Sequence, residues 1–308
     1  MTGRPGGLAG IGHTPTVRLA RIVEPGMAEV WVKLESHNPT GSYKDRMALA
    51  MIEEAERAGK LRPGQTVVEY TGGSTGSSLA FVCSVKGYPL RIISSDAYAK
   101  EKIQTMRAFG ADVELIPSPA GITPDLVPRM RARAHELAVE IGGYETDQFN
   151  NHDMVDGYRR LGDELFDQLE GRLDAYVAYV GTAGNFLGVT GGLRDRGLTF
   201  ERIVVEPAES AVLSGGRPGT HRIEGGGIGS LPPQLSASDW DGVEAVSTAD
   251  AIAMARRAAR EEGIWSGPST GANLVAALRV ASRLGDGRRV ATVLVDSGLK
   301  YLGGDVYR

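Results

Sequence analysis

The sequence predicts an α/β fold with mostly parallel sheets and helices on both sheet faces. Runs rich in strand-forming residues alternate with helical segments from about residue 29 onward. Several of these runs, such as VVEY, AYVAYV and VATVLV, are almost continuously apolar, as strands buried on both faces are. Glycine supplies 42 of the 308 residues, against a usual share of about 7 %. Such an excess is typical of tight turns and of backbone that approaches a ligand closely.

Each expected strand is a short run of β-branched, aromatic and aliphatic residues between turn residues. The expected strands span 29–35, 66–70, 90–94, 112–116, 175–180, 202–205 and 289–295. The segments between them carry apolar residues with a helical period, which is typical of a helix that packs one face against a sheet. The expected helices span 46–58, 75–86, 99–109, 125–141, 154–170, 249–262 and 272–284, and one more opens after the loop at 181–185.

The order of these elements predicts two lobes. Residues 39–149 hold four strand–helix units, which is enough for a small sheet of their own. Residues 1–38 and 150–308 are expected to form the larger domain together.

Composition excludes several classes of function. There are 34 Lys and Arg against 38 Asp and Glu, and the run Arg129, Arg131 and Arg133 is interpreted as a solvated helix face, so no nucleic-acid partner is expected. The single cysteine, Cys83, excludes an internal disulfide and a cysteine-based zinc cluster, and no metal is expected. The chain has no apolar run of about 18 residues and no apolar signal core, so we expect no membrane partner and a cytoplasmic location.

Chemistry is expected in four loops that each precede a helix, because ligands of α/β sheets bind beyond the carboxyl ends of the strands. The first loop, 38–46, contains Lys44. A lysine at a helix N-terminus faces the positive end of the helix dipole, which lowers the pKa of its amine and favours nucleophilic or Schiff-base chemistry. The alternative is a surface lysine beside Asp45 and Arg46.

The other three loops, 71–76, 181–185 and 266–272, consist of small and hydroxyl residues. The first two would expose backbone N–H groups at a helix start, and phosphate is the natural ligand of the second. Neither is a dinucleotide fingerprint or a Walker loop. The hydroxyls of the last loop either cap a helix or face a ligand. A tight turn explains any one loop, but four together with a lysine indicate a phosphorylated cofactor that forms an imine, pyridoxal phosphate.

In these loops the chain resembles the fold-type II pyridoxal-phosphate enzymes, which are two-lobed and tryptophan synthase beta-like. It is most similar to the branch of cysteine synthase (O-acetylserine sulfhydrylase) and cystathionine beta-synthase. Residues 38–46 resemble N-P-x-x-S-V-K-D-R, residues 71–76 resemble T-S-G-N-T-G, and residues 181–185 resemble G-T-G-G-T. Further matches follow in family order at 12–15, 148–151, 205–207, 225–229, 267–272 and 296–298.

The resemblance implies a role for each matching residue. Lys44 would hold the cofactor as an internal aldimine and then remove the substrate's α-proton. Ser269 would face the pyridine nitrogen and keep it unprotonated, which favours loss of a β-substituent. The cofactor phosphate would be bound by Gly181, Thr182, Ala183, Gly184 and Asn185. The substrate carboxylate would be bound by Thr71, Gly72, Gly73, Thr75 and Gln148. The larger domain would bind the cofactor, the smaller, mobile domain would bind the carboxylate, and the protein would form a homodimer.

Some positions depart from the family pattern. Ser74, still assigned to the cofactor, replaces an asparagine expected to bond the cofactor's 3′-oxygen. Gly72 replaces a serine that contacts the carboxylate, and Ala183 and Asn185 alter the phosphate site. Tyr43 replaces a small residue beside the lysine. Cofactor use survives these changes, whereas the identity of the substrate stays open.

The implied function is β-replacement on a serine-derived amino acid through an aminoacrylate intermediate, with sulfide or another small nucleophile, as in cysteine biosynthesis. One alternative is β-elimination by a serine/threonine dehydratase or cysteine desulfhydrase, which releases a keto acid and ammonia. The others are a non-catalytic regulatory paralogue, against which Lys44 argues, and a nucleotide-binding enzyme, for which the usual phosphate motifs are missing.

Overall fold

The computed structural model describes residues 6–119, 121, 123 and 125–308. The chain forms two compact units, a smaller one of residues 1–11 and 38–157 and a larger one of residues 12–37 and 158–308. Residues 6–11, 38 and 150–157, which the sequence assigns to the larger domain, cluster here with the smaller unit. Residues 1–5 lie outside the described residues.

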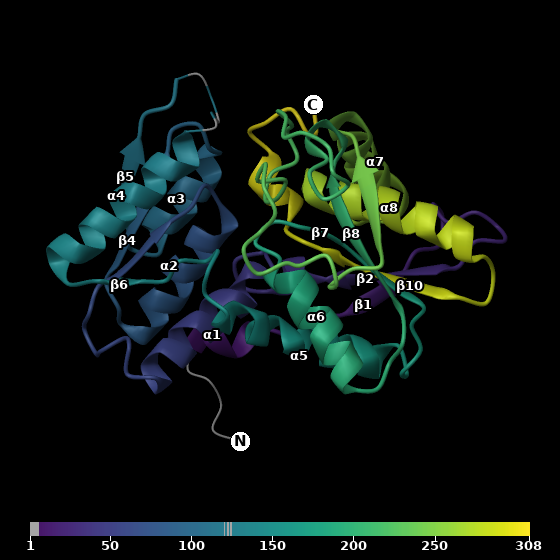
Figure 1. Ribbon diagram of the computed structural model, residues 1–308, viewed down its shortest axis with the longest axis horizontal. Coiled ribbons are helices and arrows are strands. Elements are labelled where there is room, and N and C mark those ends of the chain that lie inside the picture. The colour runs from purple at the N-terminus through teal and green to yellow at the C-terminus, as the bar shows by residue number, and fades with distance from the viewer. Residues whose placement is uncertain (1–5, 120, 122, 124) are drawn as a thin grey trace. The chain divides into compact units, whose positions relative to one another are not determined.

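The larger unit is built on a six-stranded sheet in the order β1-β2-β10-β7-β8-β9. Only β1 is antiparallel to its neighbour among these described strands. The strands are β1 (Thr16–Arg18), β2 (Glu29–Leu34), β7 (Ala175–Tyr179), β8 (Glu201–Pro207), β9 (Gly242–Val246) and β10 (Arg289–Leu294). Helices α7 (Thr248–Glu261) and α8 (Pro268–Leu284) cover one face, and α5 (Asp153–Gln168) and α6 (Gly184–Asp195) lie on the other (Figure 1).

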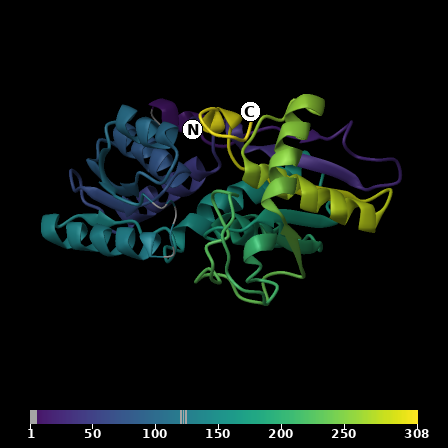
Figure 2. The ribbon, with the colours of Figure 1, turned by 90° about the horizontal axis from the view of Figure 1, so that it is seen from above.

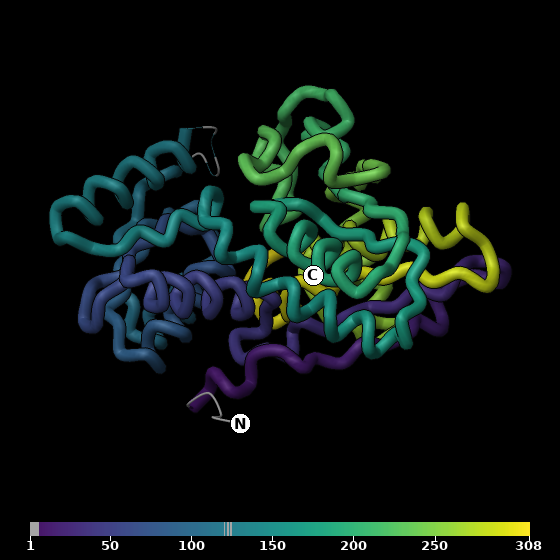
Figure 3. Tube along the Cα trace, turned by 60° about the horizontal axis from the view of Figure 1, so that its bottom comes forward, coloured from purple at the N-terminus to yellow at the C-terminus, as the bar shows by residue number. Residues whose placement is uncertain are grey.

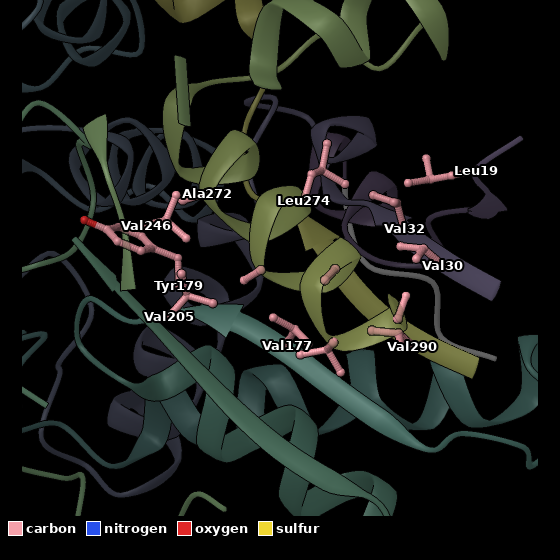
Figure 4. Packing of buried hydrophobic residues seen from close by; sticks show 14 of the residues in the cluster. Leu19, Val30, Val32, Val177, Tyr179, Val205, Val246, Ala272, Leu274 and Val290 are labelled. Atoms are coloured by element: carbon pink, nitrogen blue, oxygen red, sulfur yellow. The ribbon is translucent and has the colours of Figure 1, made fainter. Parts of the chain in front are cut away.

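The core of the larger unit lies between the central strands and α8. Valines from β2, β7, β8 and β10 meet Ala272 and Leu274 of this helix, all of them buried (Figure 4). The almost continuous apolar runs predicted this burial, because side chains on both faces of a central parallel strand are covered. The long connection 208–241 between β8 and β9 (green in Figure 3) contains one short helix, η3 (Ala208–Ser210), among its residues, all of which are described.

The smaller unit has a four-stranded parallel sheet in the order β5-β4-β3-β6. Its strands are β3 (Val67–Tyr70), β4 (Leu90–Ser95), β5 (Asp112–Ile116) and β6 (Tyr144–Glu145). Helices α2 (Ser74–Lys86) and α3 (Lys100–Ala108) lie on one face and α4 (Leu126–Ile141) on the other (Figure 2), while α1 (Lys44–Arg57) packs on α2. Cys83 of α2 is buried.

The predicted α/β architecture with mostly parallel sheets is confirmed, and all seven expected strands are present. Strands β1, β6 and β9 were not predicted, because two of them have only two or three residues and β9 is half-exposed. Helix α8 begins at Pro268, four residues before the expected start, because proline fits the first helical position. Ser269 therefore lies inside the first turn of α8 and not in the loop before it.

The contact between α7 and α8 depends on Gly271. A Cβ atom at this position would overlap the carbonyl group of Ala251 in α7. We expect Gly271→Ala to lower the free energy of unfolding by about 1–3 kcal/mol, although alanine is the better helix former. Urea denaturation measures the change. The control is Gly304→Ala, whose Cβ would meet its nearest neighbour, the Tyr301 carbonyl oxygen, at an ordinary 3.7 Å. Equal stability of the two variants would contradict this account of the helix contact.

Candidate active site

Lys44 is the first residue of α1 and is only 9 % exposed. Its Nζ lies 5.1 Å from the centroid of the Tyr43 ring. The Asp45 carboxylate holds the preceding turn by accepting hydrogen bonds from the Thr40 backbone N–H at 2.8 Å and the Thr40 hydroxyl at 2.6 Å. The Lys44 backbone N–H donates to the Ser42 hydroxyl at 3.2 Å. Lys44 is therefore buried and lies on a turn held by hydrogen bonds. This favours a functional lysine over the alternative of a surface lysine.

The loop 71–76 joins β3 to α2 and brings distant residues together. The Thr75 hydroxyl donates to Oε1 of Gln148 at 2.7 Å, and Gln148 Nε2 donates to the Tyr70 carbonyl at 3.1 Å. The Gly73 backbone N–H donates to the Thr71 hydroxyl oxygen at 3.1 Å. Predicted substrate-binding residues more than 70 positions apart in the sequence thus share one network.

The turn that carries Lys44 contacts the helix that follows this loop. Oγ1 of Thr40 and Oγ of Ser78 lie 3.3 Å apart. The loop that carries Lys44 therefore packs against α2, the helix that begins in the loop 71–76.

Glu69 is a site residue that the sequence analysis missed. It is completely buried in β3, where its carboxylate accepts from the Thr146 hydroxyl at 2.6 Å and from the backbone N–H groups of Tyr70 and Gln148 at 2.8 and 3.1 Å. Burial raises the pKa of Glu69 to about 8, although these donors oppose the shift. The carboxylate fixes the segment that carries Gln148. An acidic residue inside an apolar strand run was the available clue.

Gly72 leaves a space that the Tyr98 ring fills. A Cβ atom at position 72 would overlap this ring. The neighbouring position is also covered, because a Cβ at Gly73 would lie 3.3 Å from Cδ and 3.5 Å from Nζ of Lys102, a residue only 4 % exposed. Where the family has a serine at position 72, this chain has a glycine, and the Tyr98 ring from the segment after β4 occupies the adjoining space.

In the larger unit, the loop 181–185 runs from the end of β7 into α6. A Cβ at Gly181 would overlap the carbonyl oxygen of Gly225, so the missing side chain lets the glycine-rich run approach. Ala183 has a φ of 70°, in the left-handed region. Helix geometry leaves the N–H groups of the first turn, including those of Gly184 and Asn185, without partners inside the helix. This end of α6 suits an anion.

Ser269 lies in the first turn of α8, beside the ends of β7 and β10. Its turn is held at Ser266, whose backbone N–H donates to the Tyr307 hydroxyl at 3.2 Å and whose carbonyl accepts from it at 2.5 Å. Asn273 of the same helix accepts from the Tyr179 N–H at 2.6 Å and donates to the Val293 carbonyl at 2.8 Å.

Two buried polar atoms in the larger unit fit a bound cofactor. Ser269 is 1 % exposed and Asn185 is 7 % exposed, yet among the described residues neither Ser269 Oγ nor Asn185 Nδ2 has a hydrogen-bond partner. Such groups are costly unless a ligand or water satisfies them. A neutral hydroxyl suits a pyridine nitrogen, and an amide NH₂ at a helix N-terminus suits a phosphate.

Within residues 6–119, 121, 123 and 125–308, no three His, Cys, Asp or Glu side chains are grouped as metal ligands would be. In the same part of the chain, no helix is both long enough and apolar enough to cross a bilayer.

The chain is similar to known proteins over almost its whole length. The profile of the family "Pyridoxal-phosphate dependent enzyme" matches residues 8–296. A cysteine synthase of Staphylococcus aureus is 42 % identical over 304 residues, which are 96 % of this chain and 95 % of that protein. The structure of O-acetylserine sulfhydrylase isoform 3 from Entamoeba histolytica is 33 % identical, with a TM-score of 0.92 over 99 % of this chain and 91 % of the other. An O-acetylserine-dependent cystathionine beta-synthase from Helicobacter pylori is 34 % identical, with a TM-score of 0.91 over 100 % of both chains.

The buried Glu69 predicts a pH dependence of stability. Because the pKa of Glu69 is about 8 in the fold and about 4.3 in an unfolded chain, the folded protein holds a proton that the unfolded chain has lost at pH values between these two. Stability therefore falls as pH rises through this window. We expect the free energy of unfolding of the unsubstituted protein, relative to Glu69→Gln, to drop by a few kcal/mol between about pH 5 and about pH 8. Urea denaturation at each pH measures it, and parallel curves would contradict the assignment.

The packing of Tyr98 on Gly72 predicts coupled substitutions. We expect Gly72→Ala to lower the free energy of unfolding by about 1–3 kcal/mol, because the added methyl group overlaps the ring. In the double variant Gly72→Ala/Tyr98→Ala the methyl group has room, so the two losses should not add. Denaturation of the two single variants and the double variant measures the coupling, and strictly additive losses would show that the ring does not occupy this space.

Proposed function

Because the chain belongs to the pyridoxal-phosphate dependent enzymes, we propose that it makes cysteine from O-acetylserine and sulfide. The Cβ–O bond of O-acetylserine breaks, a Cβ–S bond forms, and acetate leaves. The activity class is pyridoxal-phosphate-dependent β-replacement, and the observation that carries it is the 42 % identity to a cysteine synthase over 96 % of the chain. The same relationship, together with the fold-type II structures, favours replacement over β-elimination.

Lys44 is proposed to carry the central chemistry. Pyridoxal phosphate, when bound, supplies an electron sink that stabilises a carbanion at Cα. Lys44 Nζ would hold the aldehyde carbon of the cofactor and then take the proton from Cα of the substrate. Its burial at the start of α1 supports this, because burial disfavours the charged ammonium form and the neutral amine is the form that acts as nucleophile and base.

Ser269 and the loop 181–185 are proposed to bind the two ends of the cofactor ring system. The neutral Ser269 hydroxyl would meet the pyridine nitrogen and leave it unprotonated, which limits charge build-up at Cα and favours loss of the β-substituent. The phosphate would be bound by the amides of Gly181, Thr182, Ala183, Gly184 and Asn185. Ser74 is proposed to face the 3′-oxygen.

The hydrogen bonds of the smaller unit sharpen the proposed carboxylate site. The Thr75 hydroxyl donates its one proton to Gln148 Oε1. Thr75 would therefore position Gln148 and would not donate to the substrate carboxylate. Thr71 accepts from the Gly73 N–H, which leaves its own proton to donate. Recognition would therefore rest on the Thr71 hydroxyl, the second Nε2 proton of Gln148 and the amides of the loop, including that of Gly72.

From the resemblance to this family we also propose that the smaller unit is mobile and that the protein forms a homodimer. Its proposed location is the cytoplasm. Light scattering of the purified protein measures the oligomeric state.

A substrate panel tests the proposed reaction. The protein is mixed with O-acetylserine, O-phosphoserine, serine, threonine or cysteine, with and without sulfide, while cysteine and pyruvate are measured. We expect rapid cysteine formation from O-acetylserine and sulfide, with little pyruvate. Pyruvate release without need for sulfide would identify an eliminating lyase instead.

Lys44→Ala is the matching variant, and exposed Lys60→Ala is its control. Lys44→Ala should abolish turnover and the visible absorbance band of the lysine-bound cofactor, whereas Lys60→Ala should keep both. Normal turnover in Lys44→Ala would contradict the assignment of this lysine. Absence of the band from the unsubstituted protein, even after addition of pyridoxal phosphate, would contradict the cofactor assignment.

A further inference from the structure

Tyr176 and Asn185 lie nine positions apart and meet in the interior of the larger unit. The Tyr176 hydroxyl donates to Oδ1 of Asn185 at 2.9 Å. Tyr176 is completely buried and Asn185 nearly so. Tyr176 belongs to β7, the strand that ends just before the loop 181–185, and Asn185 belongs to the first turn of α6, just after it.

This hydrogen bond makes the two ends of the Asn185 amide unequal. The phenol hydroxyl satisfies the carbonyl oxygen, whereas Nδ2 is buried and has no hydrogen-bond partner among the described residues. Nδ2 can only donate, and phosphate oxygens at neutral pH are strong acceptors. The amide therefore offers a donor, together with the first-turn N–H groups, at the positive end of a helix.

The position of the tyrosine is itself well defined. Its backbone is paired on both sides, with Ala291 of β10 and Arg202 of β8. Its ring is stacked on Phe186, with centroids 6.3 Å apart and planes 29° apart. A hydroxyl held in this way is a fixed reference for the rotamer of a neighbouring amide.

We propose that Tyr176 is a positioning residue, whose hydroxyl turns the Asn185 amide so that Nδ2 donates to the cofactor phosphate. The inference rests on the proposed function and adds a donor whose orientation is set by a residue that does not itself touch the ligand. If Tyr176 had only a structural role, its substitution would affect folding alone. If Asn185 did not contact the phosphate, the backbone amides alone would bind it.

The experiment measures binding of two probes, inorganic phosphate and pyridoxal phosphate, to the full-length protein after removal of cofactor. We expect Asn185→Ala to raise both dissociation constants about tenfold, the size expected for loss of one hydrogen bond to a charged group. Tyr176→Phe keeps the ring stacked but removes the hydroxyl, and should raise both constants severalfold. The ³¹P chemical shift of the loaded protein should move in both variants.

A double-variant series separates positioning from packing. Tyr176→Phe should have no further effect in an Asn185→Ala background, since the group that it orients is gone. It should also have no effect in an Asn185→Thr background, because a threonine hydroxyl needs no partner to orient it and should restore phosphate binding. Tyr88→Phe is the matched control, since this hydroxyl donates to Glu56 at 2.8 Å in the smaller unit and should leave both constants unchanged.

Three results would overturn the inference. These are an equal effect of Tyr176→Phe in every background, unchanged binding in Asn185→Ala, and a protein that binds neither probe. The last result would also overturn the proposed cofactor. If the unsubstituted protein binds phosphate with the expected dependence on both residues but does not bind pyridoxal phosphate, the anion site stands and the proposed function fails.

Discussion

The larger unit's part of the candidate site depends on one buried side chain, Asn273. Its amide accepts from the backbone of Tyr179, the last residue of β7, and donates to the backbone of Val293 near the end of β10. Asn273 thus fixes the first turns of α8, with Ser269, against the strand end from which the loop 181–185 leaves. A side chain that could not both accept and donate would leave a buried backbone group unpaired at one of these strand ends.

Around that anchor, the absence of side chains matters as much as their presence. A Cβ at Gly226 would overlap the Tyr179 ring, just as one at Gly181 would overlap the Gly225 carbonyl. The glycine-rich run can therefore close on the end of β7 only as bare backbone. In the smaller unit a buried acidic side chain has the corresponding task, because Glu69 holds the segment with Gln148 through three donors. At positions 181 and 226 glycine is required, because any side chain would prevent the two backbone segments from approaching each other.

Local patterns were sufficient for the central strands and for the loops that precede helices, because apolar runs and small residues at a helix start act through their own neighbours in the sequence. The short strand β6 was beyond such patterns, since two residues carry no periodicity. Residues such as Glu69, Tyr98 and Asn273 were missed for a different reason. Their importance depends on the residues that they contact after folding, and these tertiary contacts cannot be predicted from the residue type alone.

The departures from the family pattern are best interpreted together with the residues beside them. At position 72 a missing side chain is accompanied by the Tyr98 ring, and at position 185 an amide is accompanied by the Tyr176 hydroxyl. Ala183 adopts a left-handed conformation that costs an L-residue about 1–2 kcal/mol. None of these changes alters the chemical groups proposed for proton transfer and ring binding, Lys44 and Ser269. Substitutions in the loop 71–76 would therefore change the substrate preference, and substitutions in 181–185 would change the affinity for the cofactor. The class of reaction would stay the same.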